Sequence, residues 1–281
     1  ARGQFAKNFN YHTAILGVTG SGKTELGFDI IRHSVEKEKK VICIDLTAQY
    51  KGKLNDLDPI DLSINRDTSA ELSQKLFDVE SGSYGAGDEK KALKEFIEPI
   101  RDQVADRISK FISEENSGIG IIRLEDISNT KASLWITELY MSALLKYSRD
   151  NSDDFPGTLV VVEEAHTVMP EPSTMGLGDY DSRGLVGKIA QIALQGRKYG
   201  VGLLVLAQRT ATVSKTVLTQ CNTIISFSCY DDTSLSFLKN LYGQEFIDLI
   251  PSLPQFHGIA FGQWVKNQRP IVFDCYDETK A

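Results

Sequence analysis

Residues 17–24 of the chain read Gly-Val-Thr-Gly-Ser-Gly-Lys-Thr, and this stretch decides the fold. It matches the pattern G-x-x-x-x-G-K-T in full, and it joins an apolar run, Thr13–Val18, to a helical pattern, Thr24–Glu36. Glycines let the backbone curl so that successive N–H groups point inward, and the start of the helix adds its positive dipole. The stretch therefore predicts a phosphate-binding loop between a strand and a helix.

The residue types in this loop favour a nucleoside triphosphate with its magnesium ion. We expect Lys23 to contact the β- and γ-phosphates of ATP, and the Thr24 hydroxyl to coordinate Mg²⁺. The sequence thus predicts ATP and Mg²⁺ as cofactors, and an enzyme that hydrolyses ATP. The residues expected to bind the nucleotide are Gly17, Val18, Thr19, Gly20, Ser21, Gly22, Lys23, Thr24 and Glu25.

A second apolar run ends in the acidic group that this chemistry needs. Thr158–Val162 leads directly into Glu163 and Glu164. One carboxylate at such a strand end can reach the Mg²⁺ shell, and a second can polarise a water for in-line attack on the γ-phosphate. We therefore assign Glu163 to the metal and Glu164 to the water. Two adjacent carboxylates favour a hydrolase over a P-loop kinase or a small GTPase, and we interpret His166 as a local hydrogen-bonding partner.

Apolar runs and helical patterns alternate along most of the chain, which indicates an α/β fold with a parallel sheet. Two segments break the alternation: a helical insertion at about residues 66–113 with a Gly/Ser-rich tip at 81–87, and an irregular stretch at 169–184, expected to be a functional or mobile loop. The predicted strands are Thr13–Val18, Val41–Leu46, Ile119–Leu124, Leu159–Val162, Leu203–Ala207, Thr223–Phe227, Gly258–Phe261 and Ile271–Phe273. The predicted helices outside the insertion are Thr24–Glu36, Ser133–Tyr147 and Leu185–Lys198.

Composition narrows the class of protein. The 281 residues are 41% hydrophobic and 25% charged, and no apolar run approaches the roughly 20 residues needed to cross a bilayer. The net charge of −7 argues against a surface that grips nucleic acid all over, although it is compatible with a small basic lining inside a pore. The four cysteines form no Cys-x-x-Cys pair, which favours reduced thiols in a cytoplasmic protein. Because the sequence begins without Met, we expect an upstream domain in the natural chain.

Four segments together resemble the HerA-like ATPases of the HerA/FtsK superfamily. They are His12–Gly17, Val161–His166, Gln195–Gly202 and Leu206–Arg209. Residues 45–50 depart from that family's usual Asp-x-x-Gly-Glu-Tyr, because Ala48 and Gln49 replace the glycine and the acid. The phosphate loop and Glu-Glu-Ala-His also resemble the DEAH-type RNA helicases, but the Ser-Ala-Thr segment and second RecA-like domain of that family are missing from the sequence.

The HerA resemblance implies a RecA-like P-loop NTPase core over residues 1–281, with a mostly parallel sheet, helices on both faces, the helical insertion, and a natural N-terminal β-barrel domain before it. It implies a ring-shaped homohexamer that moves DNA through its central pore as a translocase or helicase. The resemblance also implies a nuclease or other effector protein as partner, in DNA processing or antiviral defence. It implies no association with a membrane. Gln208 would sense the γ-phosphate or orient the water, and Arg197 would stabilise transition-state charge. The segments expected to line the pore are Met169–Arg183 and Thr210–Lys215.

Three other functions stay open at the level of sequence. The chain could be an ATP-gated scaffold that organises and activates a partner enzyme without moving DNA, which its acidic charge mildly favours. It could be a conjugative coupling protein of the same superfamily, although these usually carry membrane helices. A P-loop nucleotide kinase is the third, and the paired glutamates disfavour it.

Overall fold

The computed structural model describes residues 11–81, 87–113, 117–171, 180–265 and 269–275. These ranges form a nine-stranded sheet with the strand order β3-β4-β2-β5-β6-β1-β7-β8-β9. Neighbours from β3 to β7 run parallel, whereas β8 and β9 are antiparallel additions at one edge. The strands are β1 (Thr13–Leu16), β2 (Lys40–Asp45), β3 (Ile60–Asp61), β4 (Ile119–Arg123), β5 (Thr158–Val162), β6 (Val201–Ala207), β7 (Thr223–Ser226), β8 (His257–Gly262) and β9 (Ile271–Asp274).

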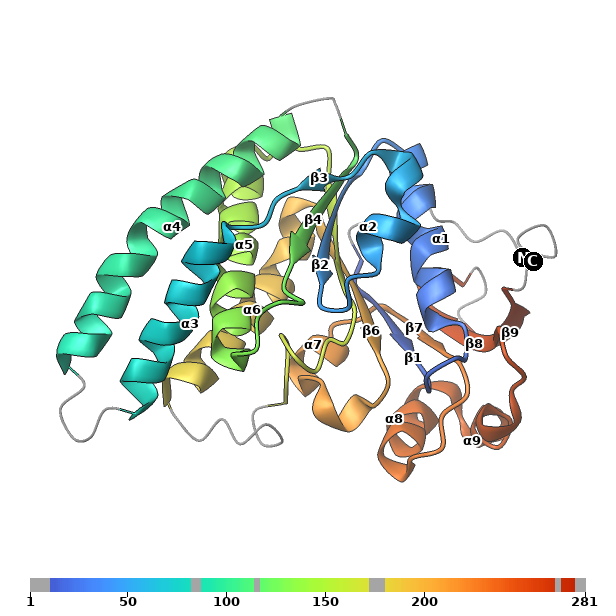
Figure 1. The fold of residues 1–281 in the computed structure, drawn as a ribbon. Coiled ribbons are helices and arrows are strands. Elements are labelled where there is room, and N and C mark those ends of the chain that lie inside the picture. The colour runs from blue at the N-terminus through green and yellow to red at the C-terminus, as the bar shows by residue number, and fades with distance from the viewer. Residues whose placement is uncertain (1–10, 82–86, 114–116, 172–179, 266–268, 276–281) are drawn as a thin grey trace.

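Helices cover both faces of this sheet (Figure 1). Because side chains alternate along a strand, neighbouring residues of β2 enter different cores: Cys43 packs with the residues of α1, and Ile44 packs with those of α5. Helices α3 and α4 form a further layer against α5. No helix in the described part of the chain is long and apolar enough to cross a membrane. The helices are α1 (Lys23–Glu36), α2 (Tyr50–Lys53), α3 (Arg66–Ser81), α4 (Gly87–Ser113), α5 (Thr130–Asp150), α6 (Tyr180–Gly196), α7 (Lys215–Leu218), α8 (Asp232–Tyr242) and α9 (Gln244–Ile247).

This architecture confirms the predicted α/β fold with its mostly parallel sheet and helical insertion. Every predicted strand is present, and α3 and α4 occupy the insertion. The sequence analysis misses β3, because a two-residue strand carries no periodicity. It also makes the irregular stretch at 169–184 too long, since α6 already begins at Tyr180. Residues 172–179 of that stretch, and 82–86 of the predicted tip, lie outside the described ranges.

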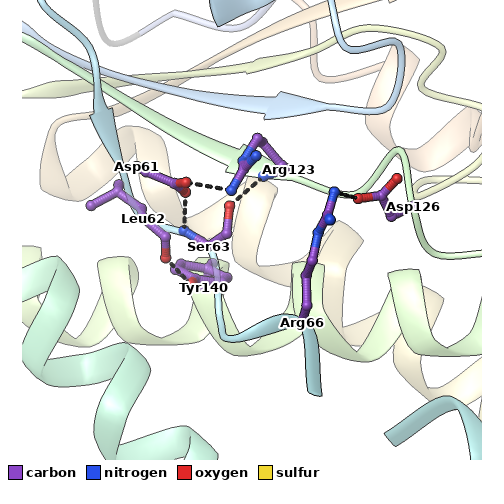
Figure 2. Close-up of polar contacts among 7 residues, drawn as sticks. All are labelled: Asp61, Leu62, Ser63, Arg66, Arg123, Asp126 and Tyr140. Carbon is purple, nitrogen blue, oxygen red and sulfur yellow. Dashed lines mark hydrogen bonds and ion pairs between the residues drawn. The ribbon is translucent and has the colours of Figure 1, made fainter. Parts of the chain in front are cut away.

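A polar cluster fastens the start of the insertion to the sheet (Figure 2). Arg123, at the end of β4, donates from Nη2 to Asp61 Oδ2 at 2.5 Å, and its backbone N–H donates to Ser63 Oγ at 2.8 Å. Arg66, the first residue of α3, forms an ion pair with Asp126 in the loop after β4. These contacts therefore fasten the short strand β3 and the first residue of α3 to the carboxyl end of β4 and the loop after it.

We predict that Tyr140→Phe weakens this attachment. Tyr140 is buried on α5 and donates its hydroxyl to the backbone carbonyl of Leu62, between β3 and α3 (Figure 2). Removing the hydroxyl leaves a buried carbonyl without its partner, so the free energy of unfolding should fall by ~1–2 kcal/mol in a denaturant titration. Tyr147→Phe, on the same helix, is the matched control and should change it by less than ~0.5 kcal/mol. Equal stability of the Tyr140→Phe variant and the wild type would contradict the assigned role.

Candidate nucleotide site

The phosphate loop lies at the carboxyl end of β1, near the middle of the sheet, and runs directly into α1. Gly20 and Gly22 have φ angles of 77° and 115°, in a region that L side chains rarely adopt. At Gly22 an added Cβ atom would also lie 2.9 Å from the ring of Phe256. The glycines of the motif are therefore required by the backbone curl and by close packing at its outer side.

Lys23 points into this loop. Its Nζ atom donates to the Val18 carbonyl at 2.8 Å, and the side chain is largely buried. Burial lowers the pKa of Lys23, while the nearby carboxylates of Glu164 and Glu163 act in the opposite direction. The ammonium thus lies between the loop and two acids, which suits it to contact the β- and γ-phosphates of a bound nucleotide.

Thr24 and Glu163 supply the ligands that a magnesium site needs. Thr24 Oγ1 donates to Glu163 Oε1 at 2.6 Å, which joins the first turn of α1 to the end of β5. The other carboxylate oxygen, Oε2, is buried and has no hydrogen-bond partner among the described residues. Burial raises the pKa of Glu163, because its charged form is desolvated. A buried, partly unsatisfied carboxylate beside a hydroxyl fits Mg²⁺, which prefers oxygen ligands.

The phosphates and waters would have to complete this metal shell. The described ranges contain no cluster of three or more His, Cys, Asp or Glu side chains that could hold a metal ion. Mg²⁺ in nucleotide sites is commonly bound through one or two protein ligands and the substrate phosphates, so the pair Thr24 and Glu163 suffices.

Glu164 is held by one hydrogen bond and has a second polar neighbour. Gln208, directly after β6, donates from Nε2 to Glu164 Oε1 at 2.6 Å, and His166 Nδ1 lies 3.3 Å from Oε2. The contact with His166 and, more weakly, the bond from Gln208 lower the pKa of Glu164, so the group is a carboxylate at neutral pH. Its backbone has a φ of 49°, a strained conformation for a residue with a side chain. These features place an ionised carboxylate at a defined position at the end of β5.

Arg197 lies at the opposite end of the sheet. It begins the short turn Arg197–Tyr199 that precedes β6, and its guanidinium lies 4.4 Å from the ring centroid of Tyr11. The phosphate loop follows the carboxyl end of β1, which pairs with the carboxyl end of β6. The seven residues of β6 span ~20 Å at about 3.3 Å each, so Arg197 and Lys23 of one chain do not meet.

Residues 45–50 form a turn, although their sequence departs from the pattern Asp-x-x-Gly-Glu-Tyr of the HerA-like ATPases. Ala48 has a φ of 61°, which explains the glycine that the family usually has there. The buried Asp45 carboxylate accepts the backbone N–H groups of Thr47 at 2.9 Å and of Tyr50 at 3.3 Å. Gln49 is exposed. The aspartate of this segment therefore organises the turn.

The two segments expected to line a pore contact each other. Pro170 and Val213 form an antiparallel bridge, and the Ser214 N–H donates to the Met169 carbonyl at 2.8 Å. Met169, Val213 and Ser214 are buried by this packing, so the expectation of an exposed lining is wrong for them. Lys215 is exposed at the start of α7.

Sequence reasoning missed Gln255 and Phe256, which contact the outer side of the phosphate loop. They lie between the short turn Ile250–Ser252 and β8, and Gln255 is 235 residues from Gly20 along the chain. No local pattern marks such a contact, because it exists only once β8 has joined the sheet.

Comparison with known proteins finds similarity in sequence to HerA and to other helicases. No family model matches the chain. The DNA double-strand break repair helicase HerA of Sulfolobus acidocaldarius is 22% identical to this chain over an alignment 333 residues long. That alignment covers 95% of this chain and 65% of the helicase. HerA of Pyrococcus furiosus is 31% identical over 111 residues, covering 38% and 19%. A probable helicase of Methanocaldococcus jannaschii is 26% identical over 167 residues, covering 57% and 31%. The chain thus spans between 19% and 65% of the length of these relatives.

Solved structures share the fold. The genome packaging NTPase B204 of Sulfolobus turreted icosahedral virus 2, in complex with ATP-γS, has a TM-score of 0.59 at 14% identity and covers 96% of this chain and 100% of its own. VirB4 of Thermoanaerobacter pseudethanolicus has a TM-score of 0.61 at 14% identity, covering 96% and 91%. The bacterial conjugative coupling protein TrwBΔN70 has a TM-score of 0.63 at 11% identity, covering 96% and 85%. With the repeated similarity to HerA, these matches confirm the resemblance: this chain is homologous, at low identity, to HerA and has the fold of the HerA/FtsK-type P-loop NTPases.

Proposed function

We propose that this chain binds ATP with Mg²⁺ and hydrolyses it. The observation that carries the proposal is the continuous set of contacts at the carboxyl ends of β1, β5 and β6. There Thr24 bonds Glu163, and Gln208 bonds the adjacent Glu164. A metal-binding pair and a fixed base lie side by side next to a phosphate loop, which is the arrangement that in-line attack of water on a γ-phosphate requires.

In the proposed reaction the loop N–H groups and Lys23 bind the phosphates, and residues 17–25 form the nucleotide-binding segment. Mg²⁺, held by Thr24 and Glu163, would neutralise charge on the phosphate oxygens. Glu164 orients a water and accepts its proton, for which its lowered pKa keeps it ionised. Gln208 holds Glu164 in position and would sense the γ-phosphate or orient the water. In this proposal Glu164 and Gln208 of the same chain orient the water and accept its proton.

The positive charge that stabilises the transition state comes, we propose, from the next subunit. Arg197 lies at the amino end of β6 and does not reach the phosphate loop of its own chain. Stacking on Tyr11 holds the exposed guanidinium in a fixed place at the surface. A ring, which we propose to be a homohexamer, would bring this surface against the nucleotide of a neighbour.

We further propose that the assembled protein is a DNA translocase or helicase. HerA is named a DNA repair helicase, and B204 a genome packaging NTPase. The same proposal includes an N-terminal β-barrel domain, a nuclease or effector partner, and a cytoplasmic role in DNA processing or antiviral defence. The ATP-gated scaffold that activates a partner enzyme is the second candidate, because the net charge of −7 is unusual for a protein that holds DNA.

The assigned base can be tested by Glu164→Gln. The variant should keep its affinity for ATP but lose roughly 10²–10⁴-fold in turnover, because an amide is a poor base. Lys23→Ala should instead lose ATP binding. Glu163→Gln should need a higher Mg²⁺ concentration for half-maximal turnover, because an amide is a poorer ligand for Mg²⁺ than a carboxylate. Steady-state turnover and equilibrium nucleotide binding separate these outcomes, and Glu36→Gln, at the far end of α1, is the control. If the Glu164→Gln variant turned over ATP at the wild-type rate, the assignment of Glu164 as the base would be wrong.

Arg197→Ala should reduce turnover by roughly 10³-fold or more while ATP affinity stays near the wild-type value. Arg149→Ala, an exposed arginine at the end of α5, is the matched control and should be unaffected. Mixing Arg197→Ala chains with Lys23→Ala chains should restore part of the activity, because a mixed interface can combine one intact arginine with one intact loop. Absence of any recovery would contradict action between subunits.

DNA should stimulate the ATPase of the full-length, assembled protein. Phosphate contacts release counterions, so the stimulation should fall steeply between low and physiological salt and should depend little on base sequence. The measurement is the ATPase rate with duplex and single-stranded DNA at two salt concentrations. A rate indifferent to DNA in a confirmed hexamer would favour the ATP-gated scaffold instead.

A further inference from the structure

Gln255 and Phe256, which directly precede β8, contact three consecutive residues of the phosphate loop. Gln255 donates from Nε2 to the Gly20 carbonyl at 2.9 Å, across a sequence separation of 235 residues. The Phe256 N–H donates to the Ser21 carbonyl, also at 2.9 Å. The ring of Phe256 lies against Gly22, where it leaves no room for a Cβ atom.

These contacts determine which way the loop amides point. In a trans peptide the C=O and the following N–H point in opposite directions. When Gln255 and Phe256 bind the carbonyls of Gly20 and Ser21 from outside, the N–H groups of Ser21 and Gly22 turn toward the inside of the loop. The Ser21 N–H accordingly meets the Val18 carbonyl at 3.3 Å, the same oxygen that accepts from Lys23 Nζ. Inward N–H groups are the ones that cradle phosphate oxygens.

The backbone of Phe256 is strained in a way that fits this task. Its φ is 64°, in the left-handed region that an aromatic residue seldom occupies. Strain of this kind persists only where the surroundings over-determine it, and it gathers at sites that clamp a ligand. Here the Phe256 carbonyl accepts from the Cys275 N–H and from Cys275 Sγ, each at 3.0 Å, beyond the end of β9. The antiparallel strands β8 and β9 thus support Phe256 from behind.

We propose that Gln255 and Phe256 are positioning residues of the phosphate loop, which they preorganise for the nucleotide phosphates. This inference rests on the proposed binding of ATP. Because both residues bond to the outer carbonyls of the loop, they act through the loop and do not touch the phosphates. Their loss should weaken nucleotide binding and leave the chemical step, which belongs to Glu164, largely intact.

The test uses the full-length protein and three variants. Gln255→Ala removes the bond to Gly20, and Gln255→Glu keeps the size of the side chain but has no N–H to donate. Phe256→Gly keeps the backbone N–H and accepts the positive φ, but loses the ring. Each should raise the equilibrium Kd for ATP and for ADP, and the KM for ATP, by about fivefold to tenfold, with kcat changed less than about twofold. Gln244→Ala, which removes a surface bond to Asp248, is the matched control and should bind like the wild type.

The melting temperature of each variant without nucleotide distinguishes positioning from simple packing. The inference expects weaker binding by Gln255→Glu at a melting temperature close to that of the wild type. Wild-type affinity in all three variants would overturn it, and so would affinity losses that appear only in variants with a lowered melting temperature. Failure of the wild-type protein to bind ATP at all is a different result, because it would overturn the proposed function first.

Discussion

The site depends on one geometric constraint: parallel strands place their carboxyl ends at the same edge of the sheet. The order β5-β6-β1 puts three such ends side by side, each carrying a different chemical group. The phosphate loop follows β1, Gln208 follows β6, and Glu163 and Glu164 follow β5. The bonds from Thr24 to Glu163 and from Gln208 to Glu164 result from this order, although nothing links those residues along the sequence.

The same edge carries an excess of negative charge. The carboxylates of Glu163 and Glu164 lie near the ammonium of Lys23, and a bound triphosphate would add more negative charge. Glu163 already has a raised pKa because it is desolvated, whereas Glu164 is stabilised as an anion by His166 and Gln208. The surroundings of these neighbouring carboxylates therefore shift their pKa values in opposite directions. The imbalance explains why a divalent ion and a cation from outside the chain suit this site.

Much of this edge could be predicted from the sequence, because its signals are local. Strands buried on both faces read as continuous apolar runs, and the chemical groups follow those runs directly. The features that could not be predicted depend on backbone conformation or on distant contacts. Ala48 gives no sign of its positive φ, and β3 is too short to show a pattern. The motif around Arg197 suggested its chemistry, but only the strand direction shows that it lies at the far end from Lys23.

During translation the phosphate loop is synthesised long before Gln255 and Phe256, the residues that contact its outer side. The strand before the loop, β1, also needs β6 and β7 as its neighbours, and both are made later. Contacts of such high sequence separation form late, because the entropy of closing a long chain segment is lost first. Until then the apolar edges of β1 and β2 are open to pairing with other chains. We therefore expect this core to complete its folding only after most of it has been synthesised, with a growing risk of aggregation whenever synthesis stalls before β8.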